Sequence, residues 1–191
     1  MARTGIPRIY LSMPDVTKPS PDRPWHLQAA AGVQFGLLTP LGGEAMIWVP
    51  QWAPAAGGGW AVTYQGRRTS VHPDVRDLRA PGEALVARLV RAAEFAERLS
   101  LPAWEETFTR VLTLAVAPRP VPPYYPDMLP SGCAEPVRVL VSMATAAYVF
   151  GGEGSWNDLG FEDPAVAREH QSISAELFAA TMGAFTAAVN A

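Results

Sequence analysis

The residues best suited to chemistry lie in a glycine-rich loop near the end of the chain. Residues 151–161 read Gly-Gly-Glu-Gly-Ser-Trp-Asn-Asp-Leu-Gly-Phe. Trp156 could stack on a ligand there, while Asn157 and Asp158 make polar contacts with it. The simpler interpretation is structural: the glycines end a preceding helix, Asn157 and Asp158 form a turn, and Trp156 fills the core. Because the flanking segments are strongly apolar, we expect the indole of Trp156 to be buried and its loop to be ordered.

The segment after this loop is predicted to be a long helix with polar residues in its apolar stripe. Asp163 suits the N-cap position, and Pro164 suits the first turn, where its missing N–H costs nothing. His170 and Ser174 stand at positions i and i+4, so their side chains are neighbours that face inward. With Asp158 they are the candidate catalytic residues, and His170 is the candidate general base. The other interpretation is a structural patch in which Ser174 bonds to a carbonyl one turn earlier.

The remaining candidate binding residues are Tyr124 and Tyr125, which lie in a proline-rich segment. Residues 118–132 contain six prolines, a density that no regular element survives. These prolines could present polyproline II to a partner or form a lid, although a rigid linker is the simpler interpretation.

Other site chemistries find little support, and no metal or cofactor is expected. Gly57-Gly58-Gly59 lacks the lysine and hydroxyl residue of a phosphate loop, and Ser155 is not in a nucleophile elbow. The lone Cys133 is interpreted as an incidental thiol. The histidines are far apart in the sequence and form no local zinc pattern: His26, His72 and His170.

The composition predicts a soluble protein. Of the 191 residues, 49% are hydrophobic and 17% charged, which can fill a sizeable core. The net charge of −3 argues against a nucleic-acid partner. The apolar run 137–150 contains Arg138 and is too short to span a bilayer, and the N-terminus has no signal core. With a single cysteine and almost no lysine, we expect a bacterial, cytoplasmic protein without a membrane partner.

Charge is unevenly distributed along the chain. Arginines dominate residues 67–98, whereas acidic residues dominate residues 153–176. The main interpretation is that these are solvated helix faces, docked on each other. The alternative is that the arginines form a surface for an anionic ligand.

The first part of the chain is predicted to form strands. Residues 33–38 and 44–49 read as a hairpin, and residues 51–59 as a loop. In residues 60–65, apolar Trp60, Val62 and Tyr64 alternate with smaller or polar residues, the pattern of a half-buried strand. Gly66 is predicted to turn this strand.

The second part is predicted to form helices. The helical period begins after Pro81, a second helix is expected near 104–116, and the last runs from Asp163 to about Asn190. Residues 135–150 read as a buried helix, with a strand as the competitor. We therefore expect an α+β protein with one domain, residues 1–191. Residues 1–78 are mainly strand and 82–191 mainly helix, so an N-terminal antiparallel meander is covered by three or four C-terminal helices.

One resemblance concerns the C-terminal part. The sequence Ser-Trp-Asn-Asp-Leu-Gly-Phe at 155–161 precedes the long helix, which ends Ala-Ala-Val-Asn at 187–190. This combination, about 40 residues in all, resembles the C-terminal part of some uncharacterised bacterial proteins. The resemblance implies that the loop is a signature, and it carries no activity, cofactor or partner with it.

The leading functional hypothesis is a non-catalytic binding or interaction protein, acting on a protein partner or within a homo-oligomer rather than on a small molecule. Aromatic residues in predicted loops and turns offer the anchors that interfaces favour. The alternative is a small-molecule enzyme, of a hydrolytic kind, with its pocket between the last helix and the Trp156 loop. A closed pocket holding both His170 and Asp158 would favour the enzyme.

Overall fold

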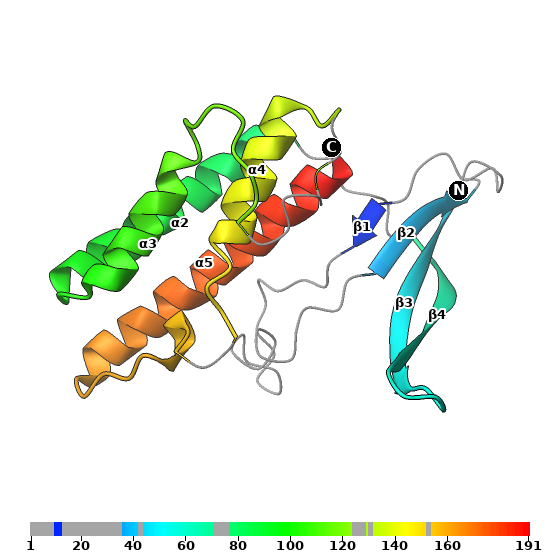
Figure 1. The fold of residues 1–191 in the computed structure, drawn as a ribbon, viewed down its shortest axis with the longest axis horizontal. Helices are drawn as coiled ribbons and strands as arrows, with labels where there is room; N and C mark the ends of the chain where they lie inside the picture. Colours follow the sequence, from blue (N-terminus) through cyan, green and yellow to red (C-terminus); the bar gives the residue numbers. More distant parts are fainter. Residues whose placement is uncertain are drawn as a thin grey trace.

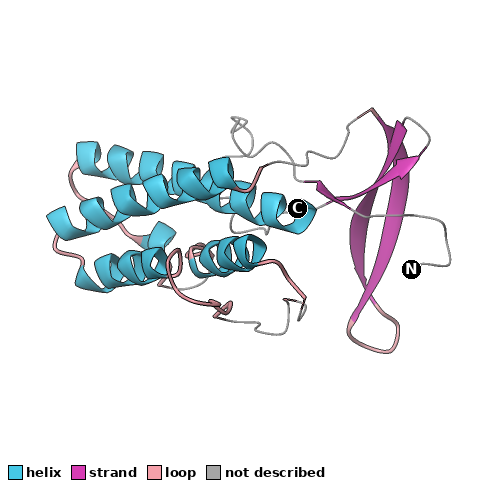
Figure 2. Ribbon diagram, turned by 90° about the horizontal axis from the view of Figure 1, so that it is seen from above, coloured by secondary structure: helices cyan, strands magenta, loops and turns pink. Residues whose placement is uncertain are grey.

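The computed structural model combines a helical bundle with an antiparallel sheet that stands beside it (Figures 1 and 2). The structure describes residues 10–12, 36–41, 44–70, 77–123, 129, 132–151 and 154–191. The α+β class predicted from the sequence is confirmed, with strands in the first part of the chain and helices in the second. Tyr124 and Tyr125 lie outside the described residues.

As far as the chain is described, the sheet has four strands in the order β1-β2-β3-β4, and all neighbours are antiparallel. The strands are β1 (Tyr10–Ser12), β2 (Gly36–Leu41), β3 (Glu44–Pro54) and β4 (Trp60–Thr69). The predicted hairpin between β2 and β3 is confirmed. Between β3 and β4 the register runs without a break from Ala45 opposite Thr69 to Pro54 opposite Trp60.

The predicted ends of β3 and β4 are wrong. β3 continues through residues 51–54, which were predicted to be a loop, because Pro50 and Pro54 are tolerated in a strand wherever no ladder bond needs their N–H. β4 continues through Gly66, which was predicted to turn it. The turn that joins β3 to β4 lies within the predicted loop, at the hairpin tip, where Gly58 and Gly59 have positive φ angles of 86° and 82°.

The helices are α2 (Arg79–Arg98), α3 (Pro102–Thr113), α4 (Glu135–Ala146) and α5 (Pro164–Asn190). The predicted start of the last helix is confirmed, since the Asp163 side chain accepts a hydrogen bond from the backbone N–H of Ala165 at 2.7 Å. Residues 135–146 are helical, which decides between the helix and the strand predicted there. α2 packs against α3 and α5, and α4 packs against α5.

The hydrophobic core that the described residues form lies inside the helical bundle. α5 contributes a continuous row of buried residues, among them Ile173, Leu177 and Phe178. By length and composition, α5 alone among the described helices could cross a bilayer, yet half of its most apolar window is buried inside the protein. That burial is what its position against α2 and α4 requires, because a central helix is apolar on several sides.

Among the described elements, the sheet contacts the bundle mainly at the end of α5. The side-chain amide of Asn190 accepts a hydrogen bond from the backbone N–H of Leu11 at 2.7 Å and donates one to the Leu11 carbonyl at 3.0 Å. β1 is therefore held by a side chain as if by another strand. The helices cover less of the sheet than expected: α5 reaches β1, whereas β4 is exposed along nearly its whole length.

Candidate functional site

Trp156 occupies the centre of an aromatic cluster inside the bundle. Its side chain has no exposed surface, so the prediction that it is buried is confirmed. The indole ring meets Phe108 edge-on at 4.9 Å and Trp104 at 5.3 Å between ring centroids, and Phe95 at 6.0 Å. The imidazole of His170 lies 4.8 Å away. Rings from α2, α3 and α5 thus enclose one side chain from the loop between α4 and α5.

The polar atoms of Trp156 are bonded to α5. Its indole Nε1–H donates to the Ser174 hydroxyl oxygen at 2.8 Å, and its backbone carbonyl lies 3.1 Å from Nε2 of His170. A carbonyl oxygen only accepts, so His170 carries a proton on Nε2. The Ser174 hydroxyl lies 3.4 Å from the same nitrogen. The prediction that His170 and Ser174 face inward and meet polar partners is confirmed.

Burial sets the charge of His170. It lowers the pKa of the imidazole below its ordinary value of 6.5, while the hydrogen bond to the carbonyl of Trp156 acts in the opposite direction. The ring is 4% exposed and has Trp156, Phe95 and Phe161 around it. The imidazole is therefore neutral at pH 7.

The polar residues of the loop bond mainly to one another. The Asp158 carboxylate accepts from the backbone N–H of Ser155 at 3.0 Å, which closes a capping box around the short helical turn Trp156–Asp158. The Asn157 side-chain oxygen accepts from the backbone N–H of Gly151 at 3.1 Å and from the Ser155 hydroxyl at 2.9 Å. Asp158 thus has its partners within the loop, while His170 and Ser174 are joined on α5.

A cavity of about 470 Å³ lies on the α3 and α4 side of this loop. Its wall is largely apolar, and Arg110 is the only charged residue among the described residues that line it. Ser155 reaches the cavity from the loop, whereas His170 and Asp158 are not among its lining residues. This cavity is therefore not the predicted pocket between α5 and the loop, because it contains neither His170 nor Asp158.

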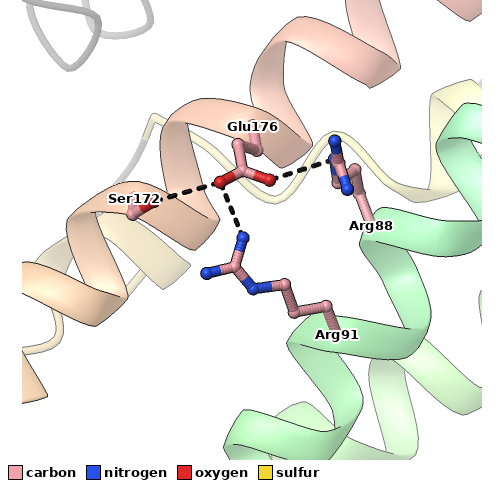
Figure 3. A network of polar contacts seen from close by, with 4 residues as sticks. All are labelled: Arg88, Arg91, Ser172 and Glu176. Atoms are coloured by element: carbon pink, nitrogen blue, oxygen red, sulfur yellow. Dashed lines mark hydrogen bonds and ion pairs between the residues drawn. The ribbon is translucent and has the colours of Figure 1, made fainter.

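Charged residues join α2 to α5. Glu176 on α5 receives Arg91 at 2.6 Å on one carboxylate oxygen and Arg88 at 3.1 Å on the other, and Ser172 donates to the first oxygen at 3.0 Å (Figure 3). Burial raises the pKa of Glu176, but these hydrogen bonds and charges outweigh it and hold the pKa below 4.5. Arg98 and Glu169 form a further pair at 2.7 Å. The prediction that basic and acidic helix faces dock on each other is confirmed for α2 and α5.

Of the aromatic residues that the structure describes, the most exposed lie on the outer part of the β3–β4 hairpin, residues 49–66, which we call the arm. Trp60 is 69% exposed, Trp52 63% and Tyr64 50%. Directly paired residues point to the same side of a sheet, and the register pairs Trp52 with Val62 and Pro54 with Trp60. One side of the arm, here the aromatic face, therefore carries six residues: Pro50, Trp52, Pro54, Trp60, Val62 and Tyr64.

The opposite face of the arm carries small or polar side chains such as Gln51, Thr63 and Gln65. No charged residue occurs anywhere in residues 45–66. The sequence signal for this surface was the alternation of Trp60, Val62 and Tyr64. That pattern predicts a half-buried strand, but both faces of β4 are exposed here, so the prediction of half-burial is wrong for the single chain.

Comparisons with known proteins give no family for the chain. No protein-family model, no curated protein and no solved structure matches it. The site is therefore interpreted from its own geometry.

Proposed function

We propose that the protein is a non-catalytic interaction protein that binds a protein partner through the aromatic face of its arm. The observation that carries the proposal is the exposure of two tryptophans and one tyrosine on one side of an uncharged hairpin. Monomeric proteins rarely expose contiguous apolar surface of this kind, and Trp and Tyr are the residues that dominate binding energy at protein interfaces.

The candidate catalytic residues support an interaction role because their polar atoms have internal partners. His170 and Ser174 bond to Trp156, and Asp158 bonds within the Ser155 capping box. His170 is also buried among aromatic rings. A general base must reach the proton that it abstracts, and here the imidazole contacts the protein core.

A protein partner suits the arm better than a lipid bilayer does. β4 is the last strand of the sheet in the part of the chain that the structure describes, so no described strand neighbours one row of its backbone N–H and C=O groups. Inside a bilayer such groups would find no water, at a cost of several kcal/mol each. A protein surface or its surrounding water satisfies them.

The experiment compares three baits in affinity capture from a lysate of the source organism, followed by titration calorimetry with the purified captured protein. The baits are the unmodified protein, Trp52→Ala/Trp60→Ala on the aromatic face, and the matched control Gln51→Ala/Thr63→Ala on the opposite face. We expect the control to bind normally and the aromatic-face variant to bind about 30-fold more weakly or worse, because buried tryptophans are interface hot spots.

Two results would contradict the proposal. One is capture of the same proteins, with the same affinity, by the aromatic-face variant. The other is binding of the unmodified protein to phosphatidylcholine vesicles or to a polysaccharide, lost on the same substitutions, with no protein partner.

A further inference from the structure

β4 is the last of the described strands, and its outer edge, which no other described strand covers, lacks the features that normally prevent strand addition. β4 spans Trp60–Thr69, contains no proline, and keeps an unbroken register with β3, so it has no bulge. Its first seven residues, 60–66, are uncharged. Natural sheets protect such edges with prolines, bulges or charges, because an unpaired strand is a template for another chain.

The prolines of β3 indicate which backbone groups of β4 face this open edge. Antiparallel pairs alternate between those that exchange hydrogen bonds and those that do not. Pro50 and Pro54 have no N–H, and they lie opposite Tyr64 and Trp60. These are therefore the pairs without hydrogen bonds. It follows that Trp60, Val62, Tyr64 and Gly66 direct their N–H and C=O groups away from β3.

The same prolines protect the other side of the arm. Within the described residues, β2 pairs with β3 only as far as Trp48, so no described strand lies beside the outer part of β3 on that side. Pro50 and Pro54 remove N–H donors from that edge. The prolines thus block strand addition at β3, whereas β4 is available. In the sheet order β4 lies at the opposite end from β1, the strand that contacts α5 (Figure 1).

We infer that β4 pairs with β4 of a second copy of this chain, antiparallel and about a two-fold axis at Thr63. In this register the uncharged segment 60–66 pairs with itself from end to end. Val62 lies opposite Tyr64 of the second copy, Trp60 lies opposite Gly66, and Thr63 lies opposite Thr63. Aromatic side chains opposite β-branched ones, and threonines opposite each other, are favourable cross-strand pairs.

The distribution of charge favours an antiparallel pairing of the two β4 strands. Arg67 and Arg68 follow the uncharged segment at one end only. The antiparallel arrangement places them beyond the hairpin tip of the second copy, at opposite ends of the paired segment. The two basic ends are then about 20 Å or more apart, given a rise of about 3.3 Å per residue, which exceeds the screening length at physiological salt. A two-fold pairing also closes on itself and does not propagate into a fibre.

The pairing of two β4 strands has a consequence for the proposed function, although the pairing is inferred from the edge of β4 and not from the aromatic face. Directly opposite residues share a side of the sheet, so the aromatic faces of the two arms would form one continuous surface. A partner bound through the aromatic face would then meet two copies of it. The dimer itself depends on the edge of β4 and not on that partner.

Cysteine cross-linking tests the register on the full chain. In a Cys133→Ser background, Thr63→Cys places two cysteines opposite each other at a pair without hydrogen bonds, where the Cα atoms are about 4.5 Å apart and a disulfide can form. The matched control is Gln65→Cys, on the same exposed face, which this register places opposite Ala61. We expect a disulfide-linked dimer from Thr63→Cys and none from Gln65→Cys.

Hydrogen exchange and sedimentation test the pairing on the unmodified protein. We expect a dimer by sedimentation equilibrium. Where nine-tenths of the chains are dimeric, the amides of Val62 and Tyr64 should exchange about tenfold more slowly than in dilute solution, by mass action. The amides of Thr63 and Gln65 are already bonded to β3, so their exchange should not slow in the same way when the protein dimerises.

Three results would overturn the inference. The first is a monomer at all accessible concentrations. The second is a dimer in which Thr63→Cys does not cross-link, and the third is equal cross-linking by Gln65→Cys. None of these results bears on whether Trp52 and Trp60 bind a protein partner, so this inference and the proposed function fail separately.

Discussion

The indole N–H of Trp156 and the hydroxyl of Ser174 form a buried hydrogen bond of 2.8 Å that joins the α4–α5 loop to the middle of α5. Ser174 has no exposed surface, and neither has Trp156. Water therefore cannot reach either group, and removing one of them leaves the other without a hydrogen-bond partner in the core.

A double-mutant cycle should measure this relationship. Ser174→Ala leaves the indole N–H without its acceptor, and we expect a loss of about 1–3 kcal/mol in the free energy of unfolding. In a Trp156→Phe background the same substitution should cost much less, because the donor is already absent, with a coupling energy of about 0.5–3 kcal/mol. Urea unfolding of the four proteins gives the values.

Ser142→Ala is the matched control for that cycle. The Ser142 hydroxyl on α4 is equally buried but has no hydrogen-bond partner in the described part of the chain. Its removal should therefore be neutral or stabilising. If Ser142→Ala and Ser174→Ala lower the free energy of unfolding by the same amount, the hydrogen bond between Ser174 and Trp156 does not contribute to stability as predicted.

His170 should make the stability of the protein depend on pH. Burial lowers its pKa below 6.5 in the folded state, so the unfolded chain takes up the proton first as the pH falls. The stability associated with neutral His170 is complete above about pH 6.5 and decreases below it, by at most about 1.4 kcal/mol per pH unit.

The measurement is the urea midpoint of the unmodified protein and of His170→Gln between pH 7.5 and 5.5. The glutamine amide can still donate to the carbonyl of Trp156, so we expect a mild loss at pH 7.5 and a weaker pH dependence. His26 and His72 are present in both proteins and cancel in the comparison. Parallel pH profiles would show that His170 does not titrate differently in the folded state.

The helical part of the fold was more predictable than the sheet because its signals are local. Asp163 and Pro164 mark the start of α5, and the helical period places His170 and Ser174 on its apolar stripe. The partners of these two residues were not predictable. They depend on how the loop docks Trp156 against α2 and α3, which is a tertiary contact.

In the sheet, a proline and a glycine, residue types that normally interrupt a strand, lie inside strands and have another role there. The predicted strand 44–49 stopped before Pro50, but β3 continues through this proline, which occupies a position where no ladder bond is needed. Gly66 was interpreted as a turn, but it provides space for the ring of Trp48 on the neighbouring strand. Both roles depend on which residue lies opposite, and a single strand does not reveal its pairing.

Glu176→Gln should weaken the docking of α2 on α5 by a small, salt-dependent amount. The Glu176 side chain is 33% exposed, and half-exposed ion pairs of this kind contribute about 1 kcal/mol or less each. Because the pKa of Glu176 is held below 4.5, its contribution is present above that pH and is lost as the pH falls through the lowered pKa.

Thermal melts in low salt and in 1 M NaCl test this prediction. Salt should reduce the difference between the unmodified protein and Glu176→Gln, since the Debye length falls to about 3 Å. The matched control is Glu83→Gln, which breaks the more exposed Arg79–Glu83 pair within α2, where the side chains are 80% and 65% exposed. Its effect should be near zero at both salt concentrations, and a loss as large as that of Glu176→Gln would contradict the docking role.

Gly66→Ala should disturb the contact between β3 and β4 at Trp48. A Cβ atom at position 66 would lie 2.8 Å from Cζ3 of the Trp48 ring, closer than carbon atoms approach each other. The ring must therefore move, and with it the hydrogen bond from its Nε1–H to the Thr39 hydroxyl, which measures 3.2 Å. We expect the indole N–H resonance of Trp48 to shift and the free energy of unfolding to fall by about 1–3 kcal/mol, the usual cost of overpacking.

The matched control is Gly57→Ala at the hairpin tip. A Cβ atom there would meet nothing within 4 Å, so this substitution should leave the Trp48 resonance in place. An unchanged Trp48 resonance in Gly66→Ala would mean that the ring does not lie on the glycine.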